Sequence, residues 1–343
     1  MINNERKSNF ELLRVISILM VLGLHYNLET MGGAFKYLIE GEVNYYFSLF
    51  IETACIVSVN CFILITGYFM CNRERINIRK VIDLITLVGF YNIGIYIVTI
   101  LIGGYKFNII DFITQLLQPK WFIIVYIALY LLLPYINKVI NNISRKEFNI
   151  LIIISMVLFS IWPSFAFNIN NTPTNDRGYG IIHFILIYLI GAYIRKYDIL
   201  NKQKYQYFFR YILLIVITFL ISTFSRRVWD YNFIINIISS IMLFGMFKNI
   251  KIESKIINYI SPFTLSVFII HTDNIFIKYI WVNTIDVLKW CNGNWYIIHL
   301  LLSIIGVYIV CILIDIVRTF IFNKTIYKLY NRIKIFNIEI QVK

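Results

Sequence analysis

The sequence predicts an all-α, polytopic integral-membrane helical bundle with about ten transmembrane helices and both termini in the cytoplasm. Of the 343 residues, 59% are hydrophobic and 17% are aromatic, and the mean hydropathy is +0.73. A soluble domain of this length does not need so much apolar surface. The net charge of +14 would suggest nucleic-acid binding in a soluble protein, but here we expect it to mark cytoplasmic loops and no nucleic-acid partner.

Apolar runs long enough to cross about 30 Å of hydrocarbon recur between short polar connectors. Each run is expected to form one helix. The predicted spans are residues 10–29, 46–70, 81–103, 121–140, 148–167, 179–195, 206–224, 231–247, 262–283 and 297–320.

The connectors test this number independently, because short cytoplasmic loops collect lysine and arginine. With the amino terminus inside, the inner connectors and termini hold 22 of the 32 lysines and arginines, and the outer connectors hold eight. The remaining two, Arg14 and Arg210, lie within spans. The bias supports ten spans and one membrane domain over residues 1–343.

Several familiar chemistries have no motif here. The sequence contains no GxxxxGK[ST], GxSxG or HExxH motif and no Asp/Glu-rich cluster, which argues against kinase, serine hydrolase and zinc protease classes. The cysteines have no paired spacing, so they are interpreted as small apolar residues, and no metal site is expected. They are Cys55, Cys61, Cys71, Cys291 and Cys311.

The first span, "ELLRVISILMVLGLHY", carries two residues that are costly in lipid, Arg14 and His25. Eleven positions amount to about 20° past three full turns, so both project from one face, about 16 Å apart along the axis. Arg14 is expected near the cytoplasmic boundary and His25 in the outer half. The alternative is structural: Arg14 reaches the lipid head groups or pairs with Glu11 at i,i+3, and His25 joins a neighbouring helix.

The second cytoplasmic connector contains "RERINIRK". If the third helix begins here, Arg75 and Arg79 share a face at i,i+4, with Asp83 one turn further. Two guanidinium groups on one face suit a phosphate, because each offers a planar fork of donors. The alternative is that the loop is basic simply because it is cytoplasmic.

A further group of polar and aromatic residues falls within or beside other spans. Asn60 is expected near mid-membrane, where an amide commonly joins helices, and Gly67 in the same span is expected to let another helix approach closely. Trp121 at an outer helix end is an ordinary interfacial aromatic, and Tyr126 continues along the same side. Glu52 is expected at a depth similar to that of His25.

The ninth span carries His271 and Asp273 about halfway along its length. Two positions correspond to about 200° around a helix, so these side chains are not expected to pair with each other. Each must therefore find partners on other helices.

The arrangement in the first span, "FELLRVISILMVLGLHY", resembles the signature of the membrane-bound acyltransferase family 3, the bacterial O-acyltransferases of surface glycans. The resemblance continues in order through "VNCFILITGYFM", where Thr66 replaces a serine common in the family. It then runs through Arg75-x-x-x-Arg79, "WFIIVYIALYLLLPYIN", "LIYLIGAYIRKY" and "SPFTLSVFIIHT". It covers nearly the whole chain.

The resemblance implies an enzyme of the bacterial cell membrane. It would move an acyl group, usually acetyl, from cytoplasmic acyl-CoA to a sugar hydroxyl of a cell-surface or lipid-linked polysaccharide. Acetyl-CoA would be a donor substrate, and no permanently bound cofactor is expected. No SGNH-type or other soluble domain is recognised, so direct transfer is the simpler hypothesis.

The residues suit these roles. His25, neutral in a site of low dielectric, is suited to accept the proton of a hydroxyl as general base, and the alternative is that His25 itself becomes acylated. Arg14 would hold the donor, and Arg75 and Arg79 would bind its phosphates. Candidates on the acceptor side are Glu52, Asn60, Trp121, Tyr126 and His271.

A transporter or flippase for a lipid-linked sugar is the alternative function, since ten spans with buried charge also describe such proteins.

Overall fold

The computed structural model describes residues 6–104, 106–165, 175–325 and 339–341, and most of these residues are helical. The helices are α1 (Ser8–Asn27), α2 (Ala34–Tyr37), α3 (Val43–Cys55), α4 (Ser58–Met70), α5 (Arg79–Leu101), α6 (Ile109–Leu116), α7 (Trp121–Asn142), α8 (Arg145–Met156), α9 (Trp162–Phe165), α10 (Ile181–Lys196), α11 (Lys204–Ser222), α12 (Ile234–Lys248), α13 (Lys255–Ile260), α14 (Thr264–His271), α15 (Asn274–Phe276), α16 (Val287–Trp290) and α17 (Tyr296–Thr325). Short π-helical segments cover Val157–Ile161 and Ile277–Ile285, and 3₁₀ turns cover Arg226–Trp229 and Ser261–Phe263.

The predicted all-α, multi-pass architecture is confirmed, but the ten spans are not all continuous helices. Among the described residues, eight helical segments are long and apolar enough to cross a membrane, with α3 and α4 forming one of them. A ninth is a bent pair of helices. The expected span 179–195 corresponds to α10, whose 16 residues extend about 24 Å, slightly short of a typical crossing.

The outer surface of the bundle is apolar, as expected for helices that face lipid. Large exposed hydrophobic side chains line α8, α11 and α17, among them Ile153, Phe209, Leu213, Leu302, Leu313 and Phe320. The chain is therefore a multi-pass membrane protein. Residues 1–5 and 342–343, at the termini predicted to be cytoplasmic, lie outside the described part.

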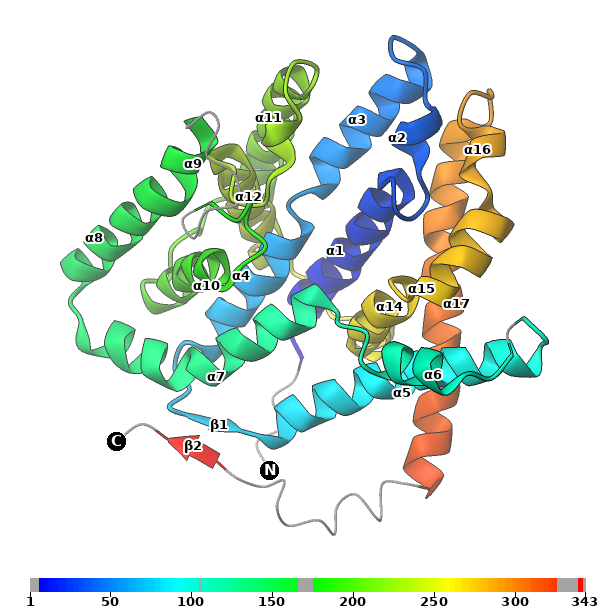
Figure 1. Ribbon diagram of the computed structural model, residues 1–343. Helices are drawn as coiled ribbons and strands as arrows, with labels where there is room; N and C mark the ends of the chain where they lie inside the picture. Colours follow the sequence, from blue (N-terminus) through cyan, green and yellow to red (C-terminus); the bar gives the residue numbers. More distant parts are fainter. Residues whose placement is uncertain (1–5, 105, 166–174, 326–338, 342–343) are drawn as a thin grey trace.

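Helix α1 lies in the middle of the bundle, with α3 and α4 on one side and α17 on the other (Figure 1). The buried apolar residues form two clusters. One is built mainly from α4, α7, α10 and α12, and the other mainly from α1, α14 and α17. Side chains of α1 belong to both clusters, so α1 joins the two halves of the molecule.

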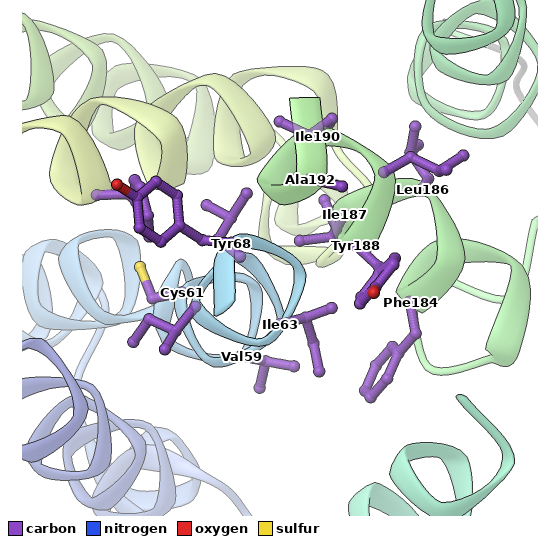
Figure 2. Packing of buried hydrophobic residues seen from close by; sticks show 14 of the residues in the cluster. Val59, Cys61, Ile63, Tyr68, Phe184, Leu186, Ile187, Tyr188, Ile190 and Ala192 are labelled. Carbon is purple, nitrogen blue, oxygen red and sulfur yellow. The ribbon is translucent and has the colours of Figure 1, made fainter. Parts of the chain in front are cut away.

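Helices α4 and α10 pack face to face because a glycine stands on each side of their contact. A Cβ added to Gly67 would lie 2.3 Å from the carbonyl oxygen of Tyr188, and one added to Gly191 would lie 2.5 Å from that of Leu64. Buried side chains of both helices surround this contact (Figure 2). The prediction that Gly67 lets another helix approach closely is confirmed.

The expected ninth span, 262–283, is broken. Helix α14 ends at His271, α15 begins at Asn274, and the two halves meet at an angle of 73°. His271 and Asp273 therefore lie at a break, not at mid-helix. The helical arithmetic that separated them does not apply, although the two side chains do bind different partners, as described below.

A second correction concerns the connector before α5. Residues Arg75–Asn77 form the strand β1, which pairs antiparallel with β2 (Glu339–Gln341), and α5 begins only at Arg79. Arg75 and Arg79 therefore do not share a helix face.

Candidate active site

Two cavities lie inside the bundle and meet at His25. The first, here called the inner cavity, has a volume of about 250 Å³ and extends along α1 from Arg14 to His25. Its other walls are mostly apolar and aromatic: Ile18, Val21, Val59, Phe62, Thr66, Leu84, Trp121, Phe122, Tyr126, Tyr231, Thr264, Leu265 and Phe268. The prediction that Arg14 and His25 project from one face of α1 is confirmed.

The second, here called the outer cavity, is larger, about 520 Å³, and begins at His25. Its walls carry five charged side chains, Glu52, Lys120, Arg177, Arg226 and Asp230. Aromatic walls come from Trp121, Tyr179, Trp229 and Tyr231. A ligand here meets both stacking surfaces and charged hydrogen-bonding groups.

Four residues belong to the walls of both cavities: His25, Trp121, Tyr231 and Phe268. The Trp121 and Tyr231 rings stack with centroids 6.1 Å apart. These four side chains form the junction between the cavities, and His25 is the residue among them suited to acid–base or nucleophilic chemistry.

A second histidine fixes the protonation pattern of His25. The Nδ1 atom of His25 lies 2.7 Å from Nε2 of His271, and Nδ1 of His271 lies 2.5 Å from the carbonyl oxygen of Val267. A carbonyl only accepts, so neutral His271 carries its proton on Nδ1 and accepts at Nε2. His25 then donates from Nδ1, which leaves its Nε2 unprotonated.

Arg14 is held at the other end of the inner cavity. Its Nη1 lies 2.5 Å from Oε1 of Glu11, and the hydroxyl of Ser261 donates to Oε2 of the same carboxylate. The i,i+3 pairing considered from the sequence is therefore present. Arg14 nevertheless remains part of the cavity wall, with 32% of its side chain exposed.

The remaining candidates fall into two groups. Glu52, Trp121 and Tyr126 line a cavity, and the Glu52 carboxylate accepts a hydrogen bond of 3.1 Å from Asn27. Asn60 and His271 are fully buried and line neither cavity.

Asn60 holds the backbone of Tyr231, one of the four junction residues, and does not line either cavity itself. It donates to the carbonyl oxygen of Tyr231 over 3.0 Å, and its Oδ1 lies 2.8 Å from Nε2 of His183. Asn60 therefore joins α4 to α10 and to the segment before α12, which is the helix-joining role considered for it from the sequence.

Arg75 and Arg79 are not part of either cavity wall. Arg75 is exposed on β1 and lies 3.9 Å from Glu339. Arg79 begins α5, and Leu84, five residues further on, lines the inner cavity. Arg79 is thus about 7.5 Å along the helix axis from the cavity wall.

Sequence reasoning missed Lys120, Tyr231 and Phe268. Lys120 was counted only as an outer-loop charge, yet it is 5% exposed and lies in the outer cavity wall. Tyr231 and Phe268 are aromatic residues in aromatic-rich spans, and nothing in the sequence distinguishes them from packing residues. Within the part of the chain that the structure describes, no three His, Cys, Asp or Glu side chains are grouped to hold a metal ion.

The fold and the site define a multi-pass membrane protein with a histidine at the junction of two internal cavities. Residues 7–316 match the acyltransferase family 3 domain, described as an acyltransferase domain. The chain therefore belongs to this family and is a membrane acyltransferase, in agreement with the sequence analysis and in preference to a transporter. No curated protein and no solved structure matches the chain.

Proposed function

We propose that the protein moves an acyl group, in the simplest case acetyl, from cytoplasmic acyl-CoA to a sugar hydroxyl of a cell-surface or lipid-linked polysaccharide at a bacterial cell membrane. His25 is the general base. The observation that carries the proposal is the position of His25 in the walls of both cavities, because a donor in one cavity and an acceptor in the other both reach this side chain.

The inner cavity suits the donor. Pantetheine is a long, uncharged arm, and the cavity is narrow and largely apolar, with hydroxyl groups from Thr66 and Tyr126 on its walls. Arg14 lies at the end that the loop charges place toward the cytoplasm, where it binds the arm. Arg79 binds a phosphate group of CoA at the entrance of the inner cavity. Its position supports this role, because Leu84, only five residues further along α5, lines that cavity. Arg75, paired with Glu339, contributes less.

The outer cavity suits the acceptor. Sugars offer apolar ring faces and many hydroxyl groups, and pockets for such ligands combine aromatic walls with a few well-placed polar groups. The aromatic walls come from Trp121, Trp229 and Tyr231, and Glu52 supplies a hydrogen-bond acceptor for a hydroxyl group. In this proposal the Glu52 carboxylate orients the sugar and takes no part in the chemistry.

The reaction requires one proton transfer in each direction. The acceptor oxygen bonds to the thioester carbonyl carbon while its proton moves to Nε2 of His25. The carbon–sulfur bond then breaks, and the CoA thiolate takes the proton back. During this exchange the charge on His25 is shared through Nδ1 with His271, whose Nε2 accepts that hydrogen bond.

The decisive variant is His25→Ala, expressed beside the wild type in cells that lack the gene. Loss of a positioned general base lowers kcat by about 10²–10⁴-fold. Surface glycan analysed by NMR is therefore expected to lose its O-acetyl signals. Equal acetylation in both strains would remove His25 from the catalytic step.

The matched control is His299→Gln. His299 bonds to the Tyr26 hydroxyl over 2.9 Å and lies in neither cavity wall, so this variant is expected to acetylate normally. Intact-mass measurement of wild type incubated with acetyl-CoA alone distinguishes the two routes. One added acetyl group, absent in His25→Ala, would indicate an acyl-enzyme, and an unchanged mass supports direct transfer.

A further inference from the structure

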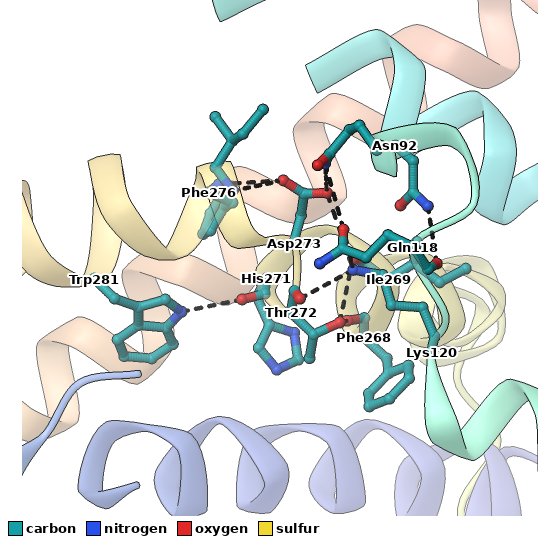
Figure 3. A network of polar contacts seen from close by, with 12 residues as sticks. Asn92, Gln118, Lys120, Phe268, Ile269, His271, Thr272, Asp273, Phe276 and Trp281 are labelled. Atoms are coloured by element: carbon teal, nitrogen blue, oxygen red, sulfur yellow. Dashed lines mark hydrogen bonds and ion pairs between the residues drawn. The ribbon is translucent and has the colours of Figure 1, made fainter. Parts of the chain in front are cut away.

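The break between α14 and α15 is held by two charged residues from distant parts of the chain. Lys120, just before α7, donates 2.9 Å to the carbonyl oxygen of Thr272, and its Nζ lies 4.0 Å from Oδ2 of Asp273 (Figure 3). The two side chains are 3% and 0% exposed. We call this pair, with its bond to Thr272, the Lys120–Asp273 brace.

The brace satisfies backbone groups that a helix break leaves without partners. A buried backbone group is costly when it has no hydrogen-bond partner. On one side of the break, the carbonyl oxygens of His271 and Thr272 accept from Trp281 Nε1 and Lys120. On the other side, Oδ1 of Asp273 accepts from the amides of Ile275 and Phe276.

The signs of the two charges match the helix ends they serve. The C-terminal end of a helix carries partial negative charge and the N-terminal end partial positive charge. Lys120 faces the end of α14, and Asp273 caps the start of α15. Gln115 donates to Asp273 over 2.5 Å and Gln118 accepts from Lys120 over 3.3 Å, so each charged group has at least two hydrogen bonds.

The brace acts directly on the residue that holds His25. His271 is the last residue of α14, adjacent to Thr272, and it accepts the hydrogen bond that His25 donates from Nδ1. Lys120 is also adjacent to Trp121, which stands at the junction of the two cavities. A shift of Lys120 therefore reaches both His271 and the junction.

We propose that Lys120 and Asp273 are positioning residues for acyl transfer: their brace fixes His271 at the helix break and so sets the orientation and tautomer of His25. The inference rests on the proposed function of His25. It assigns no contact with substrate to either residue.

Lys120 gives the brace a dependence on pH. Burial lowers the pKa of Lys120 from 10.5 to about 8, against the opposing effect of the nearby Asp273 carboxylate. Other charged or titratable groups around the same cavity are His25, Glu52, Arg177, Tyr179, Arg226, Asp230 and Tyr231, and His271 lies close by at the end of α14. Loss of the Lys120 charge above about pH 8 removes one side of the brace, so activity is expected to fall there.

Unfolding does not explain such a fall. The folded protein releases the Lys120 proton at lower pH than the unfolded chain, so the unfolded chain binds more protons between about pH 8 and 10.5. This group therefore makes the free energy of unfolding rise with pH across that window. As the pH rises above about 8, activity is therefore expected to fall while the contribution of Lys120 to thermal stability increases.

The experiment compares Lys120→Met, Lys120→Arg and the double variant Lys120→Met/Asp273→Asn in lipid nanodiscs. Lys120→Met alone leaves Asp273 as a buried charge without its partner and can fail to fold for that reason. The double variant removes both charges, and its asparagine can still cap α15. Activity is measured as CoA release from acetyl-CoA with isolated surface polysaccharide. The chain has four histidines, so ¹⁵N-histidine NMR follows His25 and His271 without any turnover.

We expect Lys120→Met and the double variant to lower kcat at least tenfold, with an unchanged KM for acetyl-CoA and altered ring-nitrogen signals of His25 and His271. Lys120→Arg is expected to keep the wild-type histidine signals. It should also abolish the fall in activity above about pH 8, because arginine stays charged. Unaltered histidine signals and an unshifted pH profile, with only a lower melting temperature, would overturn the proposal. That result would leave the test of His25 itself untouched.

Discussion

The inner and outer cavities share four wall residues and differ in almost everything else. The inner one is half the volume of the outer, and apart from His25 its only ionisable side chains are Arg14 and two tyrosines. The outer one is bordered by five charged side chains and two tryptophans. The contrast fits two chemically different substrates, a slender thioester arm and a hydroxyl-rich ring. Variants therefore fall into three classes with different expected kinetics: those at the junction, those in the inner cavity and those in the outer cavity.

The largest effect after that of His25 is expected at His271, because it serves the junction and not one cavity. His271→Ala removes the acceptor for the His25 Nδ1 proton. Loss of orientation at a reacting group costs about 10²-fold in rate. Steady-state kinetics should show this loss in kcat with both KM values nearly unchanged. A change confined to one KM would place His271 in a single cavity.

Arg14→Ala should act on the donor alone. A charge-assisted hydrogen bond contributes about 1.5–3 kcal/mol, and Arg14 is already paired with Glu11, so the KM for acetyl-CoA should rise about tenfold. Arg14→Lys keeps the charge and serves as the matched control. A higher KM for the polysaccharide would contradict the assignment of the inner cavity to the donor.

Glu52→Gln tests the outer cavity in the same way. The variant keeps the shape and the bond from Asn27 but replaces one carboxyl oxygen with an amide nitrogen that only donates. We expect the KM for the polysaccharide to rise about fivefold, since one hydrogen bond contributes about 1 kcal/mol. Isothermal titration with acetyl-CoA should show unaltered donor binding. Weakened donor binding instead would count against separate substrate cavities.

The smallest effect is expected at the entrance of the inner cavity. Arg79→Ala should weaken acetyl-CoA binding about threefold, because ion pairs at exposed positions contribute less than about 1 kcal/mol. Arg75→Ala, further from Leu84 and paired with Glu339, should leave binding unchanged. Equal losses in both variants, measured by titration, would restore the paired phosphate site that the sequence suggested.

The features predicted correctly from the sequence depend on local periodicity. Helical spacing placed Arg14 and His25 on one face of α1, and the same arithmetic offered the Glu11 pair that the structure contains. The small side chain of Gly67 indicated close helix packing, which α10 provides. Apolar run lengths located most spans within a few residues, because lipid thickness sets helix length.

The features that were missed depend on contacts between distant segments. The break coincides with the polar run HTDN at residues 271–274, but the apolar residues on both sides are long enough together to be interpreted as one continuous span. Its stabilisation comes from Lys120, more than 150 residues earlier. The condition that a helix already includes Arg75 fails for a similar reason, since Arg75–Asn77 pair with β2 near the end of the chain.

The bond between His25 and His271 joins residues separated by 246 positions. Membrane proteins are made from the amino terminus onward, and at roughly 5–20 residues per second about 12 to 50 s pass between the synthesis of these two histidines. During that interval α1 has no partner for the His25 Nδ1 proton. A truncated or unfinished chain therefore carries the proposed base without its support, which ties competence for acyl transfer to completion of the last spans.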